Sequence, residues 1–307
     1  MSRHLLAGQE VALVGRSIVF SALIVASVAC ASFAAEQQTY TFRQRYIEGQ
    51  SYNCLYSSNV NIDFERSYRG TVIDRARLAD ALQQKGLITI LQTADGIPIS
   101  QRIAVDKSSG EFYQFSGQVP SQEYVKLAGK TVDVTRQPGD FTTFKIDGYD
   151  DPRARSELTM WLGRDDDLYP NHPVKLKEKW DLSRSMGHAF LLGDDQQTIA
   201  FGKLVAVQTI YGRPFAQVMV SMAVVGTLRK AKNIHIELQA EGTAMVDLQS
   251  GRVARMDLKG EVEASGPVQV GLVGGGTATV NSVGTGKIEV HEISVAVQPK
   301  TATAAAK

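Results

Sequence analysis

Apolar and polar residues alternate along most of this chain, a period-2 pattern that predicts β-strands. The runs at 40–46, 51–64, 198–210, 215–225 and 234–238 are examples. Short turn signals separate them, as in an expected hairpin between 40–46 and 51–64 around Gly49. Strands joined by short turns favour a mainly antiparallel sheet.

The strongest turn signal is Ala94-Asp95-Gly96, between alternating runs at 87–92 and 97–105. Asp-Gly favours the left-handed backbone of a two-residue hairpin turn. Tyr211-Gly212-Arg213-Pro214 separates two further runs. We therefore expect hairpins at both places.

Two segments show helical spacing instead. Asp151 can cap a helix whose first position is Pro152, with Leu158, Trp161 and Leu162 on one face. The second segment, 74–85, carries Leu78 and Leu82 four residues apart and stops at Gly86.

These patterns together predict a mainly β (α+β) fold: a curved antiparallel sheet or half-barrel covered by two or so helices. The space between sheet and helices is then the natural ligand site. Apolar and Met residues in the expected helix and the second β run are its candidate lining; they are Leu158, Trp161, Leu162, Phe215 and Met219. The alternative is that these side chains form a filled core.

The N-terminus has the pattern of an export signal. Basic residues precede the apolar run at 17–29, and small residues follow it, so residues 1–35 are a predicted signal peptide cleaved after Ala34 or Ala35. An uncleaved anchor is the alternative, and lipidation at Cys30 is a third possibility, because Ser27-Val28-Ala29-Cys30 loosely matches a lipoprotein box. Residues 36–298 then form one β-rich domain in the periplasm or outside the cell, and 299–307 a disordered tail.

Net charge, hydrophobic content and cysteine count limit the kinds of partner and stabilising bond that we expect for this protein. The formal net charge is +1, so no global field favours nucleic acid. Hydrophobic residues make up 43% of the chain, which is enough for a real core. After cleavage Cys54 stands alone, so no intrachain disulfide is available.

No catalytic or metal-binding motif is present. The histidines lack close metal-ligand spacing, GxSxG is absent from the mature chain, and the glycines at 274–276 and 284–286 are read as turns. We therefore expect no cofactor, no metal and no enzymatic activity. A hydrolase built from distant carboxylates such as Asp165 and Asp194 stays open.

Several phrases resemble a known kind of protein: YTFRQRYIEGQSY (40–52), ITILQTADGIPISQRIAVD (88–106), LAGKTVDVTRQPGDF (127–141), YPNHPVKLKEKWDLS (169–183) and DLQSGR (247–252). Their order over residues 38–297 resembles uncharacterised exported bacterial β-rich proteins, a domain of unknown function shaped like the lipoprotein-carrier (LolA/LolB-like) half-barrels. In the phrase PVKxGxxW this chain has Lys177-Glu178 in place of the usual Gly.

The resemblance implies an envelope location and no established catalytic residues. Three functions follow as hypotheses: binding of a lipid or other apolar ligand between sheet and helices, a structural or interaction role in the envelope, and a carboxylate-based hydrolase.

Overall fold

The structure is a computed structural model that describes residues 38–114, 127–136, 142–150, 168–183, 196–228, 231–271 and 275–297. The elements of this part of the chain are strands: β1 (Thr39–Tyr40), β2 (Ser51–Tyr68), β3 (Thr71–Ala94), β4 (Ile97–Gln114), β5 (Thr131–Arg136), β6 (Thr142–Ile146), β7 (Tyr149–Asp150), β8 (Val174–Lys175), β9 (Lys179–Asp181), β10 (Gln197–Ile210), β11 (Arg213–Leu228), β12 (Ala231–Asp247), β13 (Arg252–Gly271) and β14 (Thr277–Ala296).

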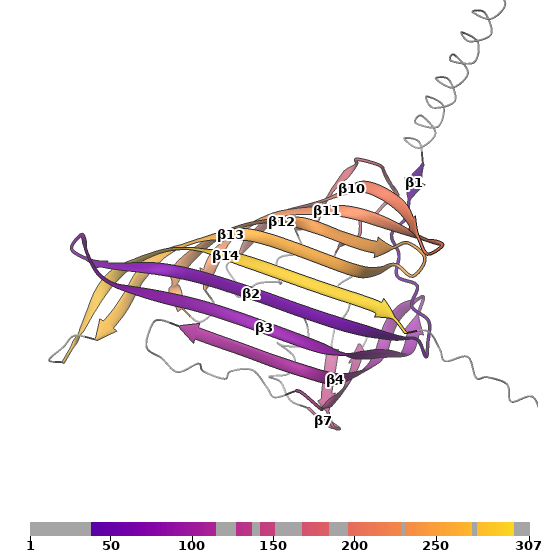
Figure 1. Cartoon of the computed structure of the whole chain (residues 1–307), viewed down its shortest axis with the longest axis horizontal. Coiled ribbons are helices and arrows are strands. Elements are labelled where there is room, and N and C mark those ends of the chain that lie inside the picture. The colour runs from indigo at the N-terminus through magenta and orange to yellow at the C-terminus, as the bar shows by residue number, and fades with distance from the viewer. Residues whose placement is uncertain are drawn as a thin grey trace, which may run out of the picture.

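Twelve of these strands form one antiparallel sheet in the order β7-β6-β5-β4-β3-β2-β14-β13-β12-β11-β10-β9. The sheet is strongly twisted and bends across its width (Figure 1). The central strands are long, and β3 alone has 24 residues. A mainly β fold with an antiparallel sheet is therefore confirmed.

Side chains on one face of this sheet, which we call the inner face, are buried. In β2 the even-numbered residues from Tyr52 to Phe64 point to it, and the same alternation continues through the neighbouring strands. Its most buried members come from strands far apart in sequence; they include Ile62, Phe64, Leu78, Ile103, Val220, Ile234, Leu238, Val262 and Ile288. The opposite, outer face carries most of the charged residues.

Close approach between neighbouring strands depends on glycine at the inner face. A Cβ on Gly242 would lie 1.9 Å from the carbonyl oxygen of Asp257, and one on Gly260 would lie 2.2 Å from that of Gln239. Both contacts are with backbone on the adjacent strand, which cannot move aside. Glycine here lets β12 and β13 bend together where any side chain would force them apart.

The expected helix at 74–85 is wrong, because these residues lie in the middle of β3. Leu78 and Leu82 satisfy helical spacing, but they are also even-numbered members of a run from Ala76 to Ile90 that is buried at every second position. The segment forms a strand because it pairs with β2 on one side and with β4 on the other. The expected helix at 151–163 lies outside the described residues, so a helical cover is not supported.

The hairpins predicted at Ala94-Asp95-Gly96 and at Tyr211-Gly212 are confirmed. Asp95 and Gly96 have φ of 52° and 80°, and Tyr211 and Gly212 have 49° and 76°, as a left-handed two-residue turn requires. Among the described residues, no helix is long and apolar enough to cross a membrane.

Candidate ligand-binding site

Residues 41–50, which we call the strap, cross one end of the sheet. The N–H of Arg45 donates to the carbonyl of Ser250 after β12 (2.8 Å), and the N–H of Tyr46 donates to that of Gly96 after β3 (2.9 Å). The strap thus joins the β12–β13 and β3–β4 turns, which the two strands β14 and β2 separate in the sheet. The expected hairpin with β2 is not formed, since β1 pairs instead with β8.

The strap alternates like a strand, and its buried side faces the inner face of the sheet. Phe42, Gln44 and Tyr46 are buried, whereas the residues between them are exposed. The Phe42 ring lies 5.7 Å from that of Trp180, and the Tyr46 ring meets Tyr52 edge-on at 5.9 Å. These aromatic contacts anchor the strap at both ends and leave Gln44 between them.

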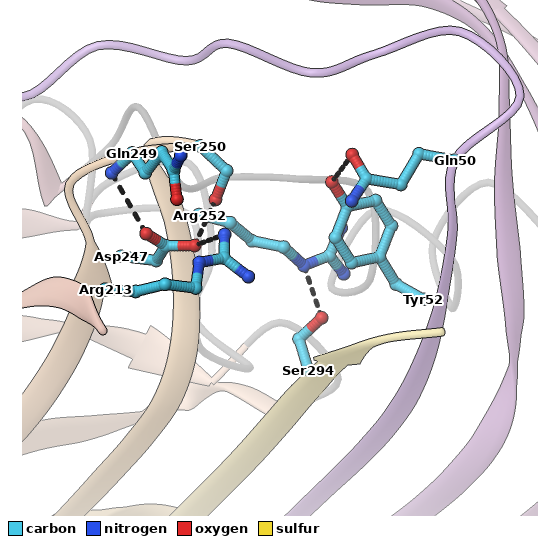
Figure 2. A network of polar contacts seen from close by, with 8 residues as sticks. All are labelled: Gln50, Tyr52, Arg213, Asp247, Gln249, Ser250, Arg252 and Ser294. Carbon is cyan, nitrogen blue, oxygen red and sulfur yellow. Dashed lines mark hydrogen bonds and ion pairs between the residues drawn. The ribbon is translucent and has the colours of Figure 1, made fainter. Parts of the chain in front are cut away.

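A buried arginine lies beneath the Tyr46 end of the strap. Arg252, only 8% exposed, extends from the start of β13 across to Ser294 on β14 and Tyr52 on β2 (Figure 2). Its guanidinium stacks on the Tyr52 ring at 3.8 Å, donates through Nε to Ser294 Oγ, and places Nη2 3.0 Å from Cys54 Sγ. A cation is thereby held against an otherwise apolar surface by an aromatic face and two polar partners.

Hydrogen bonds to Asp247 stabilise the turn before β13. This turn positions Arg252 at the start of that strand. Asp247 accepts hydrogen bonds from Arg213, from the Ser250 hydroxyl (2.8 Å) and from the N–H of Gln249 (2.9 Å) (Figure 2). The carboxylate is itself buried, so these donors compensate its desolvation.

Gln44 is the one polar side chain of the strap that points inward. It is 4% exposed, and neither its Nε2 nor its Oε1 has a hydrogen-bond partner in the structure. A buried amide without partners costs on the order of 1–3 kcal/mol for each unsatisfied group. Such a group calls for a partner, for example an ordered water or a ligand atom.

Gln44 and Arg252 are absent from the residues expected from the sequence. Gln44 stands in the segment Arg43-Gln44-Arg45, which reads as an ordinary exposed strand, and Arg252 reads as a turn residue. The available signal was the alternation of Phe42, Gln44 and Tyr46, which would place Gln44 with two aromatics.

Two of the residues predicted to line the ligand site, Phe215 and Met219, lie in the described part of the chain, on β11. Phe215 and Met219 share the outer side of β11, where Met219 is 37% exposed, whereas Met222, 5% exposed, is on the inner side. Leu158, Trp161 and Leu162 lie outside the described residues, as do Asp165 and Asp194.

The outer face has a shallow groove of about 780 Å³ across β10 to β14. Ile199 and Phe201 form its apolar wall, and they are 60% and 44% exposed. Charged side chains from the next strands form the rest, with Lys259 Nζ 3.4 Å from Glu289 Oε1. The groove is open and mixed in polarity, unlike the inner face.

An acid–histidine pair also lies on the outer face. His291 Nδ1 is 2.5 Å from Asp257 Oδ1, and Arg255 Nε is 2.5 Å from Asp257 Oδ2. The hydrogen bond from Arg255, and then that from His291, lower the pKa of Asp257 despite partial burial. Ser57 is in register with His291 on β2, but no hydrogen bond joins them in the part of the chain that is described. This row is a cross-strand polar ladder without the nucleophile contact that acyl transfer needs.

The described residues contain no group of three or more His, Cys, Asp or Glu side chains that could hold a metal ion. The candidate site in the described residues combines a largely apolar inner face, an aromatic strap and a buried cation.

Comparison with known families and with curated proteins finds no match. Among solved structures, a lipovitellin chain from a study of lipid–protein interactions is similar over 85% of this chain and 26% of its own length, at 12% identity and a TM-score of 0.41. Pseudomonas aeruginosa OpdQ is similar over 81% of this chain and 98% of its own, at 8% identity and a TM-score of 0.19. This chain spans about a quarter of the lipovitellin chain. Neither likeness is close enough to assign a family, and the resemblance to LolA/LolB-like carriers stays a prediction.

Proposed function

We propose that this protein binds a lipid or another apolar ligand along the inner face of its sheet. The observation that carries the proposal is the extent of that face: alternate residues of the strands from β5 to β10 form one largely apolar surface, whose buried polar members include Asp80, Gln84, Gln101 and Ser282. Long strands make it an extended surface, since the 18 residues of β2 span roughly 60 Å at about 3.3 Å per residue.

Some side chains of the inner face are partly exposed, which supports access of a ligand to this face. Val60, Met256 and Val268 face inward and pack against the core, yet stay partly exposed. The strap is the described segment that crosses the face at one end, where Arg252 supplies a charge. An apolar surface with a few polar groups near its entrance is the usual composition of a ligand site.

We also propose that the protein acts after export, in the periplasm or outside the cell. The support is the basic, apolar and small-residue order of residues 1–35. N-terminal sequencing of the protein from an exporting bacterial host tests this. A start near Glu36 supports cleavage, a lipid on Cys30 supports the tethered form, and a retained Met1 contradicts export with cleavage.

A photoreactive fatty acid carrying a diazirine on its chain tests the binding function. After irradiation and digestion, the labelled residues should be inner-face residues such as Val60, Met256 and Ile288. Native mass spectrometry of the gently purified protein should also show a co-purified lipid. Absence of both labelling and lipid would rule the proposal out.

A second candidate is an interaction protein of the envelope, favoured by the exposed apolar residues Ile199 and Phe201 on the outer face. In that case the diazirine probe labels these outer residues rather than the inner face. Phe201→Lys would then change the oligomeric state in light scattering and leave lipid content unaltered.

A further inference from the structure

Two hairpins project from the end of the sheet that lies opposite to the strap (Figure 1). We infer that these hairpins, β2–β3 and β13–β14, dock on the surface of a lipid bilayer. Docking goes beyond the proposed function, because it concerns the bilayer itself and not the ligand on the inner face. The features that fit a bilayer are an uncharged run of sequence, exposed apolar side chains and an arginine at the tip.

The β13–β14 hairpin lies within an uncharged run of sequence. From Ala264 to Gly286 the chain has no Asp, Glu, Lys or Arg, although these residues make up 21% of the whole. Hairpins and edge strands that stay in water commonly carry charged side chains, which prevent aggregation. A charged side chain is costly within a bilayer, so a long uncharged stretch favours contact with lipid.

The same hairpin has an apolar side and a polar side. Val268 and Val270 continue the alternation of the inner face and are partly exposed. Gln269, which lies between them, points to the other side and donates to Thr279 Oγ1 across the hairpin (2.8 Å). The apolar side is therefore continuous with the surface that we propose for the ligand, and the polar side suits the head groups of a bilayer.

The tip of the β2–β3 hairpin exposes apolar side chains beside a cation. Tyr68, Val72 and Ile73 are 42%, 53% and 51% exposed. Arg69 lies in the turn itself, with φ of 49°, and its guanidinium carbon is 5.2 Å from the centre of the Tyr68 ring. Tyr and Arg side chains both combine an apolar body with a polar end, which suits the head-group layer.

Ion pairs leave Arg69 as the cation of this tip. Glu65 is paired with Arg75 (3.0 Å) and Asp74 with Arg66, whereas no acid in the described part of the chain is paired with Arg69. The charge at the turn is therefore positive. A positive charge at the tip is complementary to the anionic head groups of a bilayer.

The two tips differ in reach as the layers of a bilayer do. The pairing of β14 with β2 ends at Asn281 and Ser67, but β14 begins four residues earlier, at Thr277. Four residues correspond to roughly 13 Å of strand at about 3.3 Å per residue. The head-group layer of one leaflet is only about 5–8 Å thick. With Tyr68 and Arg69 among the head groups, the uncharged hairpin therefore reaches the boundary of the acyl chains.

Tryptophan fluorescence with vesicles tests which end of the sheet docks. Tyr68→Trp places an indole beside the β2–β3 turn. Tyr211→Trp is the matched control, because Tyr211 is fully exposed in a left-handed two-residue turn at the opposite end. Vesicles of three parts phosphatidylcholine to one part phosphatidylglycerol should shift the emission of Tyr68→Trp to the blue, and lipids brominated on the acyl chain should quench it. The emission of Tyr211→Trp should stay unchanged, after the parent signal is subtracted from both.

Charge variants test the side of the hairpin that meets lipid. Val270→Asp should lower the affinity for these vesicles at least about tenfold in a flotation assay, because it places a carboxylate on the apolar side. Gln269→Asp adds the same charge at the next residue, on the polar side, and should lower the affinity less than about threefold. Arg69→Gln should lower the affinity about fivefold and leave the weaker binding to phosphatidylcholine alone within about twofold.

Circular dichroism checks that each variant is folded. Absence of flotation by the parent, equal responses of Tyr68→Trp and Tyr211→Trp, or equal losses from Val270→Asp and Gln269→Asp would overturn docking. A parent that does not float, but whose self-association in light scattering is lost in Val270→Asp, would assign the hairpins to a contact between copies and also overturn it.

The proposed function is tested separately, by diazirine labelling of the inner face without vesicles. This labelling should be the same in the parent and in Val270→Asp. Docking without labelling overturns the proposed function alone, and labelling without docking overturns the present inference alone.

Discussion

The indole ring of Trp180 lies directly against Gly202, its cross-strand partner on β10. A Cβ on Gly202 would stand 2.5–2.8 Å from three indole atoms. The same indole donates through Nε1 to the carbonyl of Leu168 (3.1 Å) and contacts the ring of Phe42. The absence of a side chain at position 202 therefore holds the ring that anchors one end of the strap.

Gly202→Ala should destabilise the protein by about 1–3 kcal/mol, because the added methyl forces the indole away from the sheet. Urea unfolding followed by circular dichroism measures the change. Gly271→Ala is the matched control, since a Cβ there meets nothing within 4 Å, and it should change stability by less than about 0.5 kcal/mol. Equal effects of the two substitutions would show that Trp180 does not pack as described.

Lys177→Gly should stabilise the protein. Lys177 has φ of 69° in the turn between β8 and β9, a left-handed conformation that costs a residue with a Cβ about 1–2 kcal/mol. Glycine removes this cost and adds a smaller entropic one of about 0.5–1 kcal/mol, so the net gain should be up to about 1 kcal/mol. Lys179→Gly, in β9, should instead destabilise, and a gain in thermal midpoint from both variants would contradict this explanation.

Met222→Ala should cost about 2–5 kcal/mol, and Met219→Ala less than about 1 kcal/mol. The two methionines lie on the same strand but on opposite faces, and only Met222 belongs to the buried face. Chemical unfolding of both variants thus checks which side of β11 is the core. A larger loss from Met219→Ala would mean that the faces are reversed.

Asp257→Asn should reduce stability at neutral pH and have little effect in acid. The pKa of Asp257 is lowered by Arg255 and His291, so its stabilising contribution is present above the unfolded value of about 3.9 and disappears as pH falls through the lower folded value. Because the three side chains are partly exposed, the loss should be about 0.2–1 kcal/mol at pH 7.

Unfolding free energies of the parent and Asp257→Asn from pH 7 to pH 3 measure this difference. Asp63→Asn serves as the control, since its carboxylate is highly exposed and only approaches Arg77 at 3.8 Å. A difference between parent and Asp257→Asn that stays constant across the range would exclude the linkage.

The local hydrophobic and turn pattern predicted the strands and turns correctly where it fitted only one kind of secondary structure. Asp95-Gly96 demands a left-handed turn, and the runs on either side of it pair as expected. The pattern failed at 74–85, where Leu78 and Leu82 fit both a helix and a strand. Residues four positions apart lie on one face of a helix and also on one face of a strand, so their spacing alone cannot distinguish the two. The segment is a strand because β3 pairs with β2 and β4.

The candidate site could not be predicted in the same way. Arg252 meets Cys54 across 198 positions of sequence, and that contact exists only because β13, β14 and β2 are neighbours in the sheet. Gln44 has an unremarkable sequence context, and its burial depends on the strap crossing between two distant turns.

The amino-acid order by itself determined which residues alternate, where the chain reverses and that the sheet is antiparallel, because these properties depend on neighbours a few positions apart. Tertiary structure alone decided which face of each strand is buried, that the segment after β1 leaves its expected hairpin, and that Gln44 and Arg252 are both buried at the strap end of the sheet. The physical reason is that burial and hydrogen-bond pairing are properties of strands brought together from opposite ends of the chain.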